Sequence, residues 1–301
     1  MATLYTQQDS NVWKTWFLMT MFFCVAVAVG WFISYYYQSP VILYVALGLA
    51  LVMNIVSYWH SDKISLALAH ARLARREDHL ELFRIVENLS ITAGLPQPRV
   101  YIIDDPAPNA FATGRNKEHA AVAVTSGLLA ILDKNELEGV IAHELAHIGN
   151  RDTLLMTVVV VLVGFIAILA DFFMRTFWSG GGRSERRDSG GNAGAILAVI
   201  GIVFVVLSPI IAKLIQLAIS RRREFLADSS GALLTRYPDG LASALAKISG
   251  YAAPMQSAHT ATAHLFISNP FGAGARKGMA RLFMTHPPVE ERIAALKSGG
   301  M

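Results

Sequence analysis

The sequence predicts a membrane protein in which about four transmembrane helices are combined with a soluble part of the α+β class. Hydrophobic residues make up 53% of the 301 residues and charged residues only 16%, which leaves too few polar side chains to cover a water-soluble protein of this size. The apolar residues are gathered in blocks long enough to cross a bilayer, which takes about 20 residues as a helix. The segments between these blocks carry charges and show helix-like and strand-like patterns.

The net charge is +4, from 26 basic and 22 acidic residues. No basic stripe interleaved with aromatic residues accompanies it, so we attribute it to contact with the lipid bilayer and expect no nucleic-acid partner. Cys24 is the only cysteine, which rules out a disulfide bond within the chain.

The first apolar block, residues 15–61, contains no charged residue. A Gln-Ser-Pro turn divides it into two predicted spans, 15–37 and 41–59, so residues 1–61 are expected to form a transmembrane hairpin. A cleaved signal peptide is the alternative, because an Ala-Val-Ala sequence in the first span resembles a cleavage site. The apolar run continues past that site, and only Lys14 precedes it with a positive charge, which favours an uncleaved anchor.

Residues 62–152 are soluble in character. Apolar residues recur at helical spacing over residues 66–94, where Gly94 and then Pro96 end the pattern. Three runs bounded by turn residues are expected to be strands, the middle one short: residues 99–103, 109–113 and 120–125.

A capping box marks the start of the next helix, because Asp133 is followed three residues later by Glu136. This helix carries His143 and His147, which are four residues apart and therefore lie on one face. Neutral imidazoles in this arrangement suit zinc, and Glu144 follows the first of them, where its carboxylate can take a proton from a water on the metal. Zinc lowers the pKa of that water to about 7 and polarises a carbonyl group, so the pattern predicts a hydrolase with one zinc ion per chain.

Two histidines satisfied by ordinary hydrogen bonds would also explain the spacing. The histidine pattern is uncommon by chance, and the small residues Ala142 and Ala146 allow close packing behind the imidazoles, which favours a metal site.

Residues 153–212 are expected to form a second hydrophobic hairpin. Residues 153–170 are uncharged, residues 179–194 form a glycine-rich polar loop, and residues 195–212 are again apolar. Residues 213–301 read as soluble helices with a loop, and they are expected to complete the domain begun by residues 62–152.

A catalytic zinc keeps three protein ligands and a water, so a third ligand is needed. Glu224 is the candidate, and Asp228, four residues later on the same helical face, is expected to orient a ligating histidine through its outer N–H. An acidic pair on a solvated helix would show the same spacing. Because Glu224 must meet His143 and His147, the chain between Asp152 and Arg221 crosses the bilayer an even number of times, either twice or not at all.

Four stretches in this order resemble the HtpX-type membrane zinc endopeptidases, bacterial relatives of the CAAX prenyl proteases. The stretches are PNAFATG (108–114), HELAH (143–147), SRRREFLAD (220–228) and THPPVEERI (285–293). The resemblance implies a thermolysin-like zincin core, in which a small sheet lies over the active-site helix and a substrate strand pairs with an edge strand. Asn109, Ala110 and Phe111 are the expected edge.

The resemblance also places His286 near the active site, where a histidine could stabilise an oxyanion. Alternatively, Pro287 and Pro288 open a final helix and His286 marks its N-terminal boundary.

Positive charges favour the cytoplasmic side of a membrane. The loop of the first hairpin has none, whereas several lie on the side of the expected active site: Lys63, Arg72, Arg75, Arg76, Arg221, Arg222 and Arg223. We therefore expect the active site to face the cytoplasm from the bacterial inner membrane. Against a second spanning hairpin, its loop also carries positive charges: Arg175, Arg183, Arg186 and Arg187.

The sequence thus predicts a membrane-embedded zinc endopeptidase with Glu144 as the general base. The resemblance implies proteolytic quality control, with unfolded or misfolded membrane proteins as substrates. Two alternatives stay open: a processing peptidase of the CAAX type, and a membrane chaperone or scaffold without catalysis.

Overall fold

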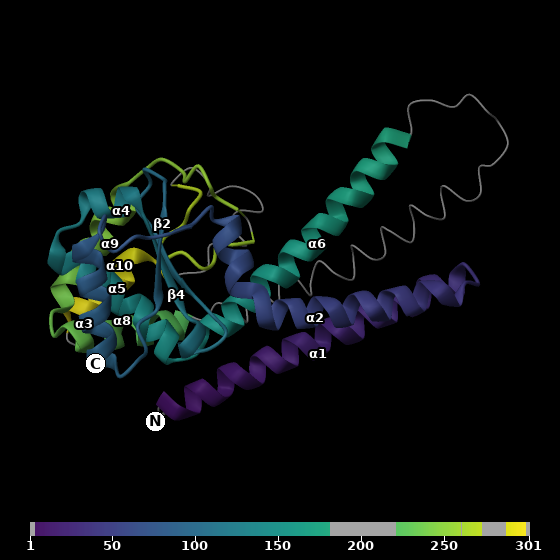
Figure 1. Cartoon of the computed structure of the whole chain (residues 1–301), viewed down its shortest axis with the longest axis horizontal. Coiled ribbons are helices and arrows are strands. Elements are labelled where there is room, and N and C mark those ends of the chain that lie inside the picture. The colour runs from purple at the N-terminus through teal and green to yellow at the C-terminus, as the bar shows by residue number, and fades with distance from the viewer. Residues whose placement is uncertain (1–3, 181–220, 260, 273–286, 299–301) are drawn as a thin grey trace.

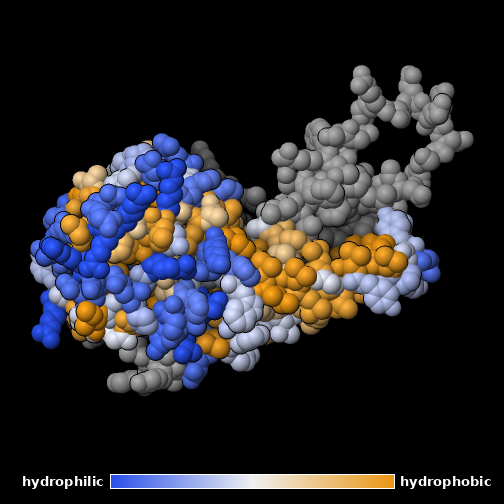
Figure 2. Space-filling view, viewed as in Figure 1, coloured by the Kyte–Doolittle hydropathy of each residue, from blue (hydrophilic) through white to orange (hydrophobic). Residues whose placement is uncertain are grey.

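The computed structural model describes residues 4–180, 221–259, 261–272 and 287–298. Helices α1 (Leu4–Tyr36) and α2 (Pro40–Leu68) form a hairpin that projects from a domain in which helices surround a small sheet (Figure 1). The hairpin surface is mainly hydrophobic and the domain surface mainly hydrophilic in Figure 2. The first predicted hairpin is therefore present, and α2 runs beyond its predicted end into the domain.

Two helices among the described residues are individually long and apolar enough to cross a membrane, at Asp9–Tyr36 and Pro40–Leu68. The third apolar segment begins helix α6 (Asp152–Gly180), which follows α5 (Lys134–Gly149) after a bend of 84°. Lys134–Gly149 and Asp152–Ile166 pass the same test together, as a bent pair. The fourth apolar segment, 195–212, and the glycine-rich loop from residue 181 lie outside the described residues. Among the described residues, two of the four expected spans are therefore present as single helices, and the bent pair would make a third.

The sheet has four strands in the order β1-β2-β4-β3. Its members are β1 (Arg72–Leu73), β2 (Arg99–Ile103), β3 (Ala110–Thr113) and β4 (Ala121–Thr125). The β2 and β4 strands are parallel, and the outer pairs β1/β2 and β3/β4 are antiparallel. All three predicted strands are therefore present, with β3 at one edge.

The helical pattern over residues 66–94 is interrupted, contrary to the sequence prediction. Helix α2 ends at Leu68, β1 follows, and α3 (Leu80–Ala93) begins only after a turn. His70 adopts a left-handed backbone conformation, with φ of 53°, which prevents α2 from continuing. The backbone of Arg72 and Leu73 is then used to pair with β2, a long-range contact that local periodicity does not reveal.

Helix α5 is the centre of the domain. The predicted capping box is present, with Asp133 Oδ1 accepting from the Glu136 N–H at 3.0 Å and the Asp133 N–H donating to Glu136 Oε2 at 2.9 Å. The domain also contains the helices η1 (Lys117–His119), α4 (Ser126–Ile131), α8 (Arg221–Thr235), α9 (Pro238–Gly250) and α10 (Val289–Lys297).

Glycine allows α8 and α9 to approach α5 closely. A Cβ atom at Gly231 of α8 would lie 2.9 Å from the backbone nitrogen of His143, and one at Gly139 of α5 would lie 2.6 Å from that of Leu241. Neither contact could be relieved by a side-chain rotation, because the neighbouring atoms belong to the backbone. The separation of α5 and α8 therefore depends on the absence of a side chain at Gly231.

We expect Gly231→Ala to destabilise the protein by about 1 to 3 kcal/mol, the usual cost of overpacking a core. Chemical denaturation in detergent micelles would measure the loss. Gly250→Ala is the control, because no atom lies within 4 Å of the added carbon, and it should change the free energy of unfolding by less than about 0.5 kcal/mol. Equal stability of the two variants would contradict the role of Gly231 in helix packing.

Candidate metal centre

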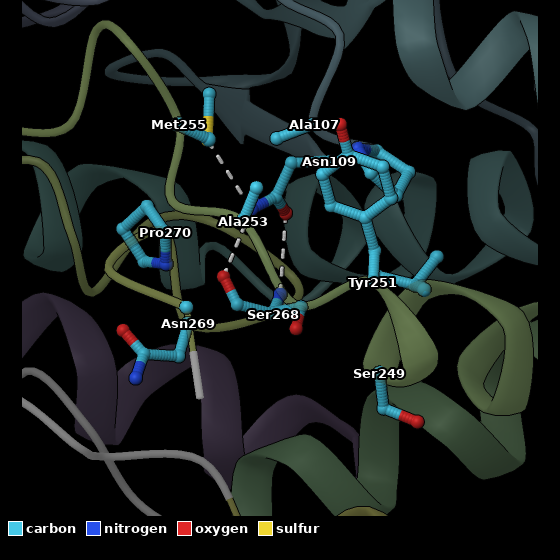
Figure 3. Close-up of a pocket in the computed structure, with 12 residues that line it drawn as sticks. Ala107, Asn109, Ser249, Tyr251, Ala253, Met255, Ser268, Asn269 and Pro270 are labelled. Carbon is cyan, nitrogen blue, oxygen red and sulfur yellow. Dashed lines mark hydrogen bonds between the residues drawn. The ribbon is translucent and has the colours of Figure 1, made fainter. Parts of the chain in front are cut away.

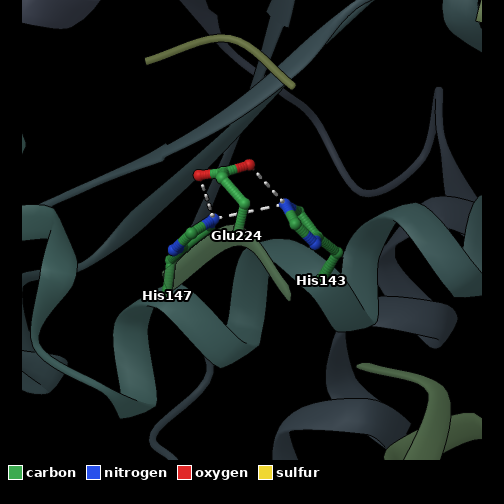
Figure 4. A group of neighbouring side chains, drawn as sticks. All are labelled: His143, His147 and Glu224. Atoms are coloured by element: carbon green, nitrogen blue, oxygen red, sulfur yellow. Dashed lines mark hydrogen bonds and ion pairs between the residues drawn. The ribbon is translucent and has the colours of Figure 1, made fainter. Parts of the chain in front are cut away.

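Three side chains from two helices converge in the domain (Figure 4). His143 and His147 come from α5, and Glu224 comes from α8. The two Nε2 atoms are 3.2 Å apart, and the Glu224 carboxylate oxygens lie 3.9 Å from His143 Nε2 and 3.7 Å from His147 Nε2. The structure thus brings together the three residues that the sequence predicted as metal ligands.

The geometry of this triad fits a small divalent cation. One ligand atom from each residue lies within 4.8 Å of the others. Tetrahedral bonds of about 2.0 to 2.1 Å place ligand atoms about 3.3 Å apart, close to the separation of the two imidazole nitrogens. His143, His147 and Glu224 are 1%, 5% and 4% exposed, and two imidazoles with a carboxylate form a donor set that suits a buried metal ion.

The outer nitrogen of each histidine faces a carboxylate. His143 Nδ1 lies 2.9 Å from Asp228 Oδ1, a close electrostatic contact rather than a well-aligned hydrogen bond. His147 Nδ1 lies 3.1 Å from Asp152 Oδ2. Such carboxylates fix the orientation of metal-bound imidazoles. Asp228 lies where the sequence predicted, but the role of Asp152 was missed, because it follows the bend after α5 and no helical spacing links it to His147.

Arg292 is a second residue whose role the sequence did not reveal. Its guanidinium group is fully buried and donates to both oxygens of Asp228, at 2.8 and 2.6 Å. It also lies 3.8 Å from Glu224 Oε2 and 3.5 Å from His143 Nε2. A buried arginine this close to the triad neutralises carboxylates that would otherwise repel each other. The THPPVEERI stretch contains Arg292, but no spacing rule connects α10 to α5.

The first membrane helix also contacts this centre. The Asn11 side-chain amide donates to Asp152 Oδ1 at 2.5 Å and to the Asn150 carbonyl at 3.2 Å, and its oxygen accepts from Arg223 at 3.3 Å. Every polar atom of this buried amide therefore has a partner. Asn11 links the carboxylate behind His147 to the residue next to Glu224, so the hairpin helps to position the triad.

The buried charges change the proton affinities of the site. Burial raises the pKa of Glu144 to about 7, against the opposing effect of His147. Burial lowers the pKa of His143 to about 4. For His147, the carboxylates of Asp152 and Glu224 outweigh burial and raise the pKa to about 9. A metal ion bound by the triad would displace the proton from His147, because a ligating imidazole must be neutral.

Arg292 lowers the pKa of its carboxylate partner, Asp228. The guanidinium charge outweighs the effect of burial and lowers the pKa of Asp228 to about 2. Asp228 is therefore ionised at neutral pH and available as an acceptor beside His143.

The expected substrate-binding residues lie beside this centre. Asn109 immediately precedes β3, and Ala110 and Phe111 belong to it. All three are buried, and β3 packs against α5. His286 lies outside the described residues. Pro287 and Pro288 immediately precede α10, which begins at Val289.

The sequence matches the model of peptidase family M48 over residues 76–299. The chain belongs to this family. The protein called "Protease HtpX homolog" from Thermoanaerobacter pseudethanolicus is 48% identical over 297 residues, which are 98% of each chain. A protein of the same name from Pyrococcus furiosus is 48% identical over 290 residues, or 96% of each chain. The resemblance to HtpX-type proteases is confirmed, and the protein is a membrane metalloprotease.

A crystal structure of S. mikatae Ste24p shares the fold, with a TM-score of 0.50 and 16% identity. The alignment covers 93% of this chain and 62% of that one, so the chain spans less than two thirds of that larger protein. This likeness concerns the fold alone.

Asp152→Asn should lower the affinity for a divalent metal ion by about 10- to 100-fold, the usual effect of losing a partner of a ligating histidine. Asn11→Ala removes a partner of Asp152 and not of the histidine, so it should lower the affinity by a smaller factor. Competition with a chromogenic chelator would measure this on detergent-purified protein. Ser57→Ala is the matched control, since this buried hydroxyl in α2 donates only to the Met53 carbonyl of its own helix. An unchanged affinity in both test variants would show that the contacts do not position His147.

Proposed function

We propose that this membrane metalloprotease is a zinc-dependent endopeptidase that cleaves unfolded or misfolded membrane proteins at the cytoplasmic face of the bacterial inner membrane. The observation that carries the proposal is the position of Glu144. Its buried carboxylate lies on the helix that supplies His143 and His147, and the same centre contacts the membrane hairpin through Asn11. The site thus combines hydrolytic groups with a direct connection to the membrane-embedded part of the chain.

A zinc ion bound by the triad would supply a water of lowered pKa and polarise the carbonyl of the peptide bond. Glu144 is suited to take the proton from the attacking water, because its buried carboxyl group directly follows His143 on the helix that supplies both histidines. The same carboxyl group can return the proton to the leaving amine. Asp152 and Asp228 hold the imidazoles in place, and Arg292 keeps Asp228 ionised.

Three features support a thermolysin-like zincin core, a four-span topology and a cytoplasmic active site as parts of this proposal. The sheet with edge strand β3 packs on α5, as such a core requires. Glu224 joins the histidines although an apolar stretch separates them in sequence, which agrees with an even number of crossings. The charge distribution of the first hairpin favours a cytoplasmic active site.

Glu144→Gln should retain the metal ion and lose at least about 100-fold in the rate of casein cleavage, because general acid–base catalysis contributes about 10² to 10⁴. Metal content and cleavage would be measured on the same preparation. Glu138→Gln is the control, since among the described residues this glutamate of α5 pairs with Lys134 at 3.8 Å and not with the metal triad. Full activity of metal-loaded Glu144→Gln would show that Glu144 is not the base. Cleavage of prenylated peptides but not of unfolded chains would instead favour a CAAX-type peptidase.

The orientation can be tested in a Cys24→Ser background. A membrane-impermeant thiol reagent should label Ser39→Cys, in the hairpin turn, from outside intact spheroplasts. It should label Glu118→Cys, in the exposed helix η1, only after the membrane is opened. The reverse pattern would place the active site on the outer face.

A further inference from the structure

One edge of the sheet is covered by a distant segment of the chain. The Asn109 carbonyl accepts from the Thr125 N–H on β4, so the backbone groups of the next residue, Ala110, face the outer edge of β3. Outward groups of an edge strand are free to pair with another extended chain. Here the Ala110 carbonyl accepts from the Ile267 N–H at 2.9 Å.

Residues 266–268 lie along β3 as an added antiparallel strand would. The Asn109 side chain holds both backbone groups of Ser268, accepting from its N–H at 3.2 Å and donating to its carbonyl at 3.0 Å (Figure 3). The Phe266 ring packs edge-on against the Phe111 ring with centroids 5.0 Å apart. Residues 266–268 therefore run antiparallel to residues 109–111, as a peptide does when it adds a strand to the edge of a sheet.

The same segment reaches the metal centre. Arg292 donates to the Ile267 carbonyl at 3.2 Å, and its guanidinium lies 3.5 Å from His143 Nε2. Both backbone groups of Ile267 are therefore held, one by β3 and one by a residue in contact with the triad. These contacts recognise backbone atoms and not side chains, which is what an endopeptidase with varied substrates needs from its groove.

The side chains of this segment are accommodated by apolar surroundings. Phe266 and Ile267 are 0% and 3% exposed and belong to the two core clusters on either side of the sheet. Beyond Ser268 lies a cavity of about 170 Å³, whose lining includes Asn109, Tyr251 and Met255 (Figure 3). None of the three triad residues lines this cavity, which is bordered by Asn109 and Ser268.

We propose that residues 266–268 are an internal competitor of the substrate. They occupy a groove formed by Asn109, Ala110 and Arg292, and a substrate must displace them before it can pair with β3. The groove accordingly takes an extended peptide and accommodates a branched apolar side chain at the position of Ile267. This proposal rests on the proposed endopeptidase function and deepens it, since it identifies how the substrate backbone is held and what restrains the protease.

Phe266→Ala weakens the covering segment without changing the groove residues. It should raise kcat/KM for unfolded casein at least about threefold, because substrate binds only the fraction of molecules with a free groove. Metal affinity should not change. Phe165→Ala is the matched control, because it removes an equivalent edge-on ring pair with Phe22 in the membrane helices, and it should not raise kcat/KM.

Hydrogen exchange separates this proposal from a structural role of the segment. In metal-loaded Glu144→Gln, a saturating unstructured peptide with a central isoleucine should remove the protection of the Ile267 and Ser268 amides. Retained protection with the peptide bound would overturn the proposal, as would a lower kcat/KM in Phe266→Ala. If neither the wild type nor Phe266→Ala cleaved casein, the proposed endopeptidase function would be wrong, and this proposal would be wrong with it.

Discussion

The convergence of three buried ligands on one metal ion is the constraint on which the rest of the structure depends. His143 and Glu224 are 81 positions apart in the sequence, and an apolar stretch lies between them. Their side chains nevertheless approach within 3.9 Å. Burying two imidazoles and a carboxylate is costly unless each group is paired, so the surrounding carboxylates and Arg292 are part of the same requirement.

Several features of the fold follow from this convergence. The chain turns by 84° after α5, which brings Asp152 behind His147 before α6 leaves the domain. Gly231 lets α8 lie against the backbone of His143, so that Glu224 can reach the metal position. Arg292 from α10 joins the centre from the far end of the chain. The two soluble parts of the sequence therefore form one domain, with the metal position at their junction.

Local patterns in the sequence predicted the elements that depend on neighbouring residues alone. The capping box before α5, the β-branched runs of β2 and β4, and the four-residue spacing of the histidines each depend on residues within one turn or strand. The role of Asp228 was also predictable, because it shares a helical face with Glu224. Asn11, Asp152 and Arg292 were not, because their roles depend on how α1, α6 and α10 approach α5. The interruption at His70 was missed for the same reason, since β1 exists only through its pairing with β2.

The contact between Asn11 and Asp152 connects the chemistry of the site to the thickness of the bilayer. Helix α1 is anchored in the membrane by its apolar length, and a helix adapts to a thinner or thicker bilayer by tilting or sliding. Each residue of an α-helix advances by about 1.5 Å, so a slide of a single residue would shift the Asn11 amide by about half the length of a hydrogen bond. The alignment of the contact between Asn11 and Asp152 would then change. The contact through Asn11 therefore links the position of α1 in the bilayer to the carboxylate behind His147.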